Sequence, residues 1–264
     1  KVNEEEIKNE IEKCSEDPKY FINNYIKISH PMRGIIPFDM YRFQERLIDE
    51  LHVVKPPAAT MEDLRRFHTP RYLDELQAGD KARGGNGGDC APYMPGSWAA
   101  ATHSAGLAIA AVEAVALGDV DNAYALCRPP GHHARPAQGM GFCLFNNIAI
   151  AARYAQEEHG VGKVLVVDWD VHHGNGTQDL YYYESEVLTL SVHGDPEPCF
   201  PYYTGYSNEN GSGEGRGYNL NFPLPKGTNF EEYRRVIEGH VLTDIRNFEP
   251  DYLIICAGFD TYKK

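Results

Sequence analysis

The stretch that most constrains the fold is residues 163–176, KVLVVDWDVHHGNG. Its four consecutive apolar residues, 164–167, are typical of a strand that is buried on both faces of a parallel sheet. Asp170 and His172 follow directly, and side chains two residues apart in an extended chain point to the same side. A carboxylate and an imidazole that converge at the carboxyl end of a buried strand predict half of a metal site.

The rest of the chain alternates between short apolar segments and stretches with helical periodicity. This alternation predicts an α/β domain at residues 56–264, with a three-layer, mostly parallel sheet and helices on both faces. Residues 1–55 read differently, and we expect a helical N-terminal segment of different origin, with helices at residues 4–13 and 41–53. The strands expected in the larger domain lie at residues 123–127, 163–168, 187–192 and 252–256, and a helix is expected at residues 230–248.

The charge and the cysteines narrow the class of protein. The chain carries 38 acidic and 25 basic residues, a balance that argues against a nucleic-acid backbone as partner and suits cationic substrates. No signal peptide and no apolar run of membrane-spanning length is apparent, so we expect no membrane partner. The six cysteines are scattered and form no C-x-x-C pair, which favours reduced thiols and a cytoplasmic location.

Polar residues follow the ends of several expected strands. Because the carboxyl ends of parallel strands meet at one edge of a sheet, Asp260, after the strand at residues 252–256, is expected beside Asp170 and His172. Two carboxylates and one imidazole would give zinc three protein ligands and leave a position for water and substrate. Iron(II) or cobalt(II) would also suit this donor set, and affinity alone does not choose among the three metals.

The adjacent His132 and His133 follow the strand expected at residues 123–127. Beside a metal they would supply a base for water and an acid for a leaving amine, although two turn histidines on the surface are the plainer alternative. Asp168 is expected to orient one histidine or to hold a monovalent cation, and Asn175 to orient the other. Three further residues are expected either to wall a narrow apolar channel or simply to pack in the core: Gly141, Phe142 and Phe200.

Three motifs together resemble the zinc-dependent histone deacetylase superfamily, in particular its class II branch, over residues 58–264. They are RPPGHHARPAQGMGFCLFNNIAIAA, VLVVDWDVHHGNGTQ and AGFD. The stretch SVHGDPEPCFPYYTGYSNENGSGEG, together with DTY after AGF, is most similar to acetylpolyamine amidohydrolases and bacterial deacetylase-like members.

The resemblance implies the arginase/deacetylase fold and a set of roles. Asp170, His172 and Asp260 would bind zinc, and His132 and His133 would be the catalytic pair. Phe142 and Phe200 would flank the channel for the acyl-lysine, and Asp89 would lie on a rim loop that positions the substrate. A potassium ion is implied near Asp168, Asp170, His172, Ser191 and Val192.

Two departures from the family pattern affect what we expect. The catalytic tyrosine of the family lies in a glycine-rich loop well after AGFD, and Tyr262 is not in the matching motif, so the fold is expected to lack its C-terminal part. Residues 1–51 weakly resemble instead the start of a phage large terminase subunit. That family is an ATPase, and we reject this activity because no G-x-x-x-x-G-K-[ST] loop follows.

The resulting hypothesis is a metal-dependent amide hydrolase that removes acetyl groups from acetyl-lysine in a peptide or from a small acetylated amine such as an acetylpolyamine. A truncated or composite protein that binds metal with little or no turnover is the alternative. An arginase-like dinuclear hydrolase would need further carboxylates around a second metal. A homo-oligomer, in which a partner subunit narrows the rim, would favour the small polyamines.

Overall fold

The computed structural model describes residues 27–30, 34–37 and 53–261, and it divides into two units, Lys1–Lys55 and Pro56–Lys264. In the first unit, strands β1 (Lys27–His30) and β2 (Gly34–Pro37) form an antiparallel hairpin. The helices expected at residues 4–13 and 41–53 lie outside the described residues, apart from Val53.

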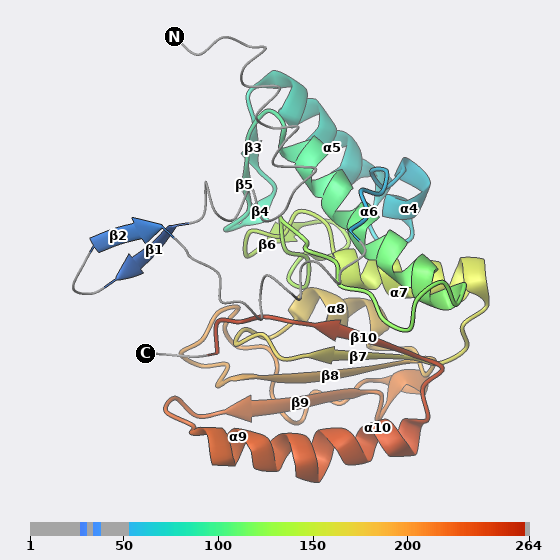
Figure 1. Cartoon of the computed structure of the whole chain (residues 1–264), viewed down its shortest axis with the longest axis vertical. Coiled ribbons are helices and arrows are strands. Elements are labelled where there is room, and N and C mark those ends of the chain that lie inside the picture. The colour runs from blue at the N-terminus through green and yellow to red at the C-terminus, as the bar shows by residue number, and fades with distance from the viewer. Residues whose placement is uncertain (1–26, 31–33, 38–52, 262–264) are drawn as a thin grey trace. The chain divides into compact units, whose positions relative to one another are not determined.

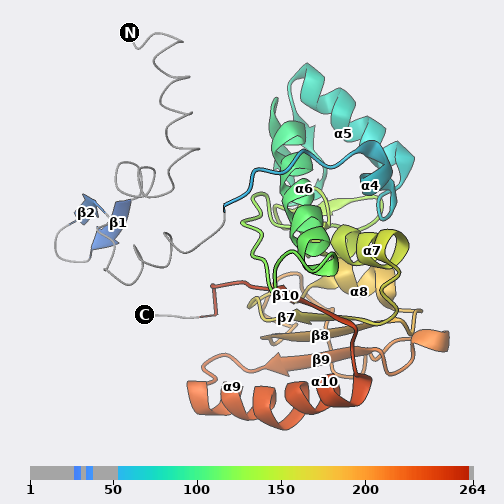
Figure 2. The same ribbon diagram turned by 45° about the vertical axis from the view of Figure 1, so that its right-hand side comes forward.

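The second unit alternates helices and strands around one sheet (Figures 1 and 2). Four strands pair in the order β10-β7-β8-β9, and every pairing is parallel. Short two-residue strands, β3 (Gly85–Asn86) with β5 (Pro92–Tyr93) and β4 (Gly88–Asp89) with β6 (Gly139–Met140), form two small additional ladders. The main elements are α4 (Met61–Arg65), α5 (Pro70–Ala82), α6 (Ser97–Ala116), α7 (Asn147–His159), β7 (Val164–Asp168), α8 (Asn175–Tyr181), β8 (Val187–Gly194), β9 (Asn219–Leu224), α9 (Phe230–Val236), the π-helical turn η2 (Ile237–Val241), α10 (Leu242–Phe248) and β10 (Tyr252–Cys256).

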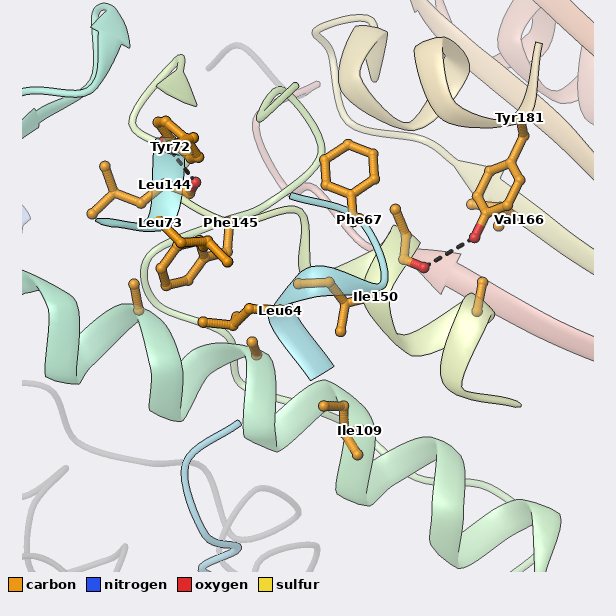
Figure 3. Close-up of a cluster of buried hydrophobic side chains, with 14 of the residues drawn as sticks. Leu64, Phe67, Tyr72, Leu73, Ile109, Leu144, Phe145, Ile150, Val166 and Tyr181 are labelled. Atoms are coloured by element: carbon orange, nitrogen blue, oxygen red, sulfur yellow. Dashed lines mark hydrogen bonds between the residues drawn. The ribbon is translucent and has the colours of Figure 1, made fainter. Parts of the chain in front are cut away.

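Strand β7 is buried along its whole length, and its side chains alternate between two cores. Val164 and Val166 join a cluster that includes residues of α4, α5, α6 and α7 (Figure 3). Leu165 and Val167 face the opposite cluster, which includes Val241 and Phe248 of the C-terminal helices. Strand alternation thus buries both faces, and the expected three-layer α/β arrangement is confirmed.

Two tyrosines form hydrogen bonds through their hydroxyl groups inside the cluster that contains Val164 and Val166, which we call the first core. The Tyr181 hydroxyl donates to the Ala149 carbonyl at 2.9 Å, and the Tyr72 hydroxyl donates to the Leu144 carbonyl at 2.9 Å (Figure 3). A buried hydroxyl without a partner would be costly, so these bonds let the large rings fill the core.

Helix α6 is long and apolar enough by composition to cross a membrane, contrary to the expectation that no run of this kind is present. Its small side chains Ala101 and Ala105 are buried in the first core, and Ile109 and Val112 are buried on the same helix. The apolar character of α6 therefore serves packing against α7, because small residues let two helices approach closely.

Three expectations about secondary structure were wrong or incomplete. Residues 123–127 form no strand: Tyr124 and Leu126 are 63% and 75% exposed, and the segment pairs with no described strand, so its apolar pattern lacks the ladder a strand needs. Strand β9 was not expected, since its Asn residues and Pro223 weaken the strand signal. The helix expected at residues 230–248 is interrupted by the π-helical turn.

Candidate metal and catalytic site

The three expected metal ligands come together just beyond the sheet. The Nδ1 atom of His172 lies 2.9 Å from an oxygen of Asp170 and 3.1 Å from an oxygen of Asp260. One candidate ligand atom from each residue lies within 4.8 Å of the other two. This convergence of two carboxylates on one imidazole nitrogen is the arrangement expected of a mononuclear metal site.

The pairing of β7 with β10 explains how residues 90 positions apart in the chain meet. In this parallel ladder Asp168 lies opposite Cys256, so both strands end at the same level. Asp170 and Asp260 then lie two and four residues beyond the paired ends. The backbone N–H of Val171 donates to the second oxygen of Asp260 at 3.0 Å, which fixes that carboxylate.

The carboxylates and the imidazole are electrostatically coupled. Burial disfavours the Asp170 carboxylate, but its hydrogen bonds with His172 outweigh burial and lower its pKa to about 2. The same hydrogen bond raises the pKa of His172 against the effect of burial. A site that gathers this much negative charge around one imidazole attracts a cation.

His132 is held by a buried carboxylate. Its Nδ1 atom lies 2.8 Å from an oxygen of Asp168, and both side chains are almost fully buried. Desolvation opposes the charged imidazolium, but the attraction and hydrogen bond of Asp168 outweigh desolvation and raise the pKa of His132. His132 is therefore suited to carrying a positive charge beside the site.

His133 has the opposite character, although the centroids of the two rings are only 3.9 Å apart. Its Nδ1 lies 2.8 Å from the Oδ1 atom of Asn175, and a carbonyl oxygen only accepts, so Nδ1 carries the proton. Burial, followed by repulsion from His132, lowers the pKa of His133 to about 3. Its Nε2 has no hydrogen-bond partner among residues 53–261, and its lone pair is available as a base.

Aromatic rings and a glycine border the two histidines. The Phe200 ring stands edge-on to His133 with centroids 5.0 Å apart and lies 6.3 Å from His172. A Cβ on Gly141 would lie 2.4 Å from the His133 ring and 2.8 Å from Phe200, so only glycine fits there. The exposed Phe142 follows in a left-handed conformation at φ 65°.

The remaining expected residues lie on neighbouring elements. Asp89 pairs with Met140 in the β4–β6 ladder, and its carbonyl accepts from the N–H of Gly141, which ties the predicted rim loop to the channel wall. On β8, Ser191 lies opposite Asp168 in the parallel ladder, and Val192 is the next residue. The structure thus brings every expected site residue to this edge of the sheet or to the loops that border it.

Cys256 was not anticipated as part of this site. Its thiol groups with His132 and Asp168 as a second set of atoms within metal-binding reach of one another. Desolvation, followed by the charges of Asp168 and Asp170, raises the pKa of Cys256 well above its usual range, so the thiol stays protonated. The signal that could have revealed it was its place as the last residue of an expected strand, directly before AGFD.

Comparison with known proteins agrees with this geometry. The histone deacetylase domain matches residues 28–264. The chain belongs to the histone deacetylase family. The match starts at the β1–β2 hairpin, within the segment that the sequence pattern had set apart.

Relatives and solved structures support the assignment. The chain is 48% identical over 216 residues to the histone deacetylase-like amidohydrolase of Pseudomonas aeruginosa, covering 81% of this chain and 56% of the relative. It is 44% identical over 176 residues to an acetylpolyamine amidohydrolase of Burkholderia pseudomallei, covering 67% of this chain and 50% of the relative. The crystal structure of an acetylpolyamine aminohydrolase from that organism superimposes with a TM-score of 0.77 at 33% identity, covering 84% of this chain and 73% of that one. The chain spans about half the length of these two curated relatives.

Histone deacetylases are typically metal-dependent, and the residues present fit such a metal. The donor set of Asp170, His172 and Asp260 combines oxygen and imidazole nitrogen, the chemistry that suits zinc, iron(II) or cobalt(II). Asp260 is held in place by the Val171 N–H, so part of the ligand set is already oriented.

Proposed function

We propose that this protein is a metal-dependent deacetylase that hydrolyses the acetyl amide of an acetylated lysine or an acetylated polyamine. The observation that carries the proposal is the neutral His133, whose Nε2 is free, beside three converging metal ligands and an aromatic wall. Amide hydrolysis needs a base for water, an acid for the amine and polarisation of the carbonyl, and these residues supply the first two.

Each residue then has a defined part. Asp170, His172 and Asp260 would hold zinc, which would supply Lewis-acid chemistry to the substrate carbonyl and to water. His133 accepts the water proton at Nε2 and returns it to the leaving amine, while Asn175 keeps the proton on Nδ1. The imidazolium of His132, paired with Asp168, stabilises negative charge that develops on the substrate.

Two further parts of the proposal concern a second cation and the cellular location. A potassium ion beside Asp168, Asp170, His172, Ser191 and Val192 would brace the loop that carries the ligands; the adjacent positions of Asp168 and Ser191 in the sheet support it. The free cysteines among the described residues support a reducing, cytoplasmic location.

The test is acetate release from N-acetylputrescine and from an acetyl-lysine peptide, using protein loaded with one equivalent of zinc. We expect release by the unmodified protein and a loss of about 10²–10⁴-fold for His133→Ala, because a general base contributes on that order. His103→Ala, at an exposed histidine of α6, is the matched control and is expected to keep full activity.

Zinc content and circular dichroism of each variant show whether the site and the fold survive. If zinc is retained but neither substrate is hydrolysed, the deacetylase proposal is wrong for this chain. The second candidate, a protein that binds metal with little or no turnover, would then describe it.

A further inference from the structure

Two exposed tyrosines follow Phe200 closely in the chain, and the ring of the first contacts the Phe200 ring. Tyr202 and Tyr203, here called the tyrosine rim, are 51% and 75% exposed. The Tyr202 ring stands edge-on to Phe200 with centroids 5.9 Å apart, and Phe200 in turn lies 6.3 Å from His172. The rings therefore lead stepwise outward from the metal ligands to solvent.

The loop that carries the tyrosine rim is fixed by backbone hydrogen bonds. The N–H of Tyr202 donates to the Cys199 carbonyl at 3.0 Å, and the N–H of Tyr203 donates to the Pro196 carbonyl at 2.9 Å. Farther along, the Glu209 carboxylate accepts from the N–H groups of Gly205 and Tyr206. The loop backbone beneath the two exposed rings is thus fixed, so less backbone entropy is lost when the loop binds a ligand.

The same loop carries uncompensated negative charge. Residues 194–215 contain Asp195, Glu197 and two further glutamates but no Lys or Arg. Neither Asp195 nor Glu197 forms an ion pair with any residue in the described part of the chain. The pKa of Tyr206, on the same loop, is raised by desolvation and then by the charges of Glu197 and Asp195, so these two carboxylates lie close enough to act on the Tyr206 hydroxyl. Tyrosine faces beside carboxylates form a surface that attracts a cation.

The two substrate classes of the proposed function differ in the charge of the group that lies four methylene groups from the amide nitrogen. In N-acetylputrescine, four methylene groups separate the amide nitrogen from a charged ammonium. In an acetyl-lysine residue, four methylene groups separate the amide nitrogen from the neutral Cα. For a substrate whose acetyl amide lies beside His133 and His172 and whose chain extends outward past Phe200, the distal ammonium would approach the loop of the tyrosine rim.

We propose that the tyrosine rim, together with Asp195 and Glu197, binds a second, positively charged group of the substrate and so selects small acetylated polyamines over acetylated lysine in a peptide. This inference rests on the proposed deacetylase function and names its substrate class. Cation–π contact and carboxylate attraction both act on the distal ammonium, and neither acts on a neutral group at the same position.

The kinetic test compares N-acetylputrescine with N-pentylacetamide, in which a methyl group replaces the ammonium. We expect kcat/KM of the unmodified protein to favour the charged amide by about 10-fold or more at low salt, with a smaller preference at high salt. In the double variant Tyr202→Asn/Tyr203→Asn the preference should fall by about 3-fold or more, to the part that the two carboxylates supply, with the rate on N-pentylacetamide nearly unchanged. Asparagine removes the rings and tolerates the left-handed φ of 58° at both positions.

Matched control variants distinguish the effect of replacing the tyrosine rim from the effect of any substitution on the protein surface. Glu197→Gln should lower the preference in part, because one of two carboxylates remains. Tyr183→Asn and Glu231→Gln, at exposed positions outside the loop, should leave the preference unchanged. A preference that is absent in the unmodified protein, or that is undiminished in the double tyrosine variant, overturns the inference.

A binding measurement makes the inference independent of turnover. Calorimetry on zinc-loaded protein carrying His133→Ala should give tighter binding of N-acetylputrescine than of N-pentylacetamide, and the difference should shrink by about 3-fold or more when the rim tyrosines are also replaced. Acetate release without a preference that depends on the tyrosine rim would support the deacetylase proposal and contradict the inference about the tyrosine rim. Binding that depends on the tyrosine rim, without acetate release, would support the inference and contradict the deacetylase proposal. Equal binding of the two amides would contradict the inference.

Discussion

His68 and His133 are both buried, and burial lowers the pKa of each to about 3, yet the two regions that hold them use the imidazole differently. His68 packs among the rings of the first core, with its centroid 4.5 Å from that of Phe67 and 5.4 Å from that of Phe145. Its Nε2 accepts from the backbone N–H of Asn146 at 3.0 Å. Its other nitrogen, Nδ1, lies 3.3 Å from the Pro136 carbonyl, so both ring nitrogens are bonded to backbone.

His133 has the same tautomer but only one bonded nitrogen. Asn175 accepts from Nδ1, whereas Nε2 has no partner among the described residues and the neighbouring rings are those of His132, His172 and Phe200. Burial and pKa alone therefore do not separate a structural histidine from one that we propose to be catalytic. The distinction lies in whether the backbone already uses the lone pair of Nε2.

The largest effect on the rate of acetate release should appear when the same substitution is made at each of these two positions in turn. His133→Gln is expected to lower acetate release by about 10²–10⁴-fold, because the general base is lost. His68→Gln should change the rate per folded molecule by about 2-fold or less, since it lies outside the site. The measurement is kcat/KM on N-acetylputrescine, corrected for the folded fraction; similar losses at both positions would break the comparison.

The second prediction is that His68 makes the stability of the folded protein depend on pH. The folded pKa of His68, about 3, lies below its unfolded value of 6.5, so the unfolded chain binds the proton first and stability falls as the pH drops below 6.5. Between pH 7.5 and pH 4.5, protonation of His68 in the unfolded chain should lower the free energy of unfolding by about 2–3 kcal/mol, at 1.36 kcal/mol per pH unit.

Urea unfolding at both pH values checks this prediction. His68→Gln should remove that part of the pH dependence while the contributions of the other histidines cancel in the difference. His103→Gln, at an exposed position, should follow the unmodified protein at both pH values. An unchanged pH slope in His68→Gln would show that His68 is not held neutral by its two backbone bonds.

A smaller effect is expected from the residue that sets the tautomer of His133. Asn175→Ala removes the acceptor for Nδ1–H, so the proton is no longer confined to Nδ1 and the ring is less firmly oriented. We expect a loss of about 10–100-fold in acetate release with zinc content retained, as is usual for residues that orient a functional histidine. Asn208→Ala, at an exposed asparagine, is the control, and full activity of Asn175→Ala would show that His133 is oriented by packing alone.

Much of this site could be predicted from the sequence because it depends on short-range rules. The apolar run 164–167 indicates a buried strand, and the two-residue spacing of Asp170 and His172 places them on one side of the chain. Asp260 could be added because parallel strands end at a common edge. The strand expected at residues 123–127 shows the limit of such reasoning, because an apolar pattern says nothing about whether a neighbouring strand is available to pair with.

The sequence by itself therefore determined the family, the buried strand at the centre of the sheet and the residue types that gather at its end. These follow from motifs and from the periodicity of a single chain segment. The tertiary structure decided the pairing of Asp168 with Cys256, the fixing of Asp260 by Val171 and the fact that Nε2 stays free on His133 but is bonded on His68. Those outcomes depend on contacts between residues up to about 90 positions apart, and such contacts exist only once the strands have paired and the helices have packed.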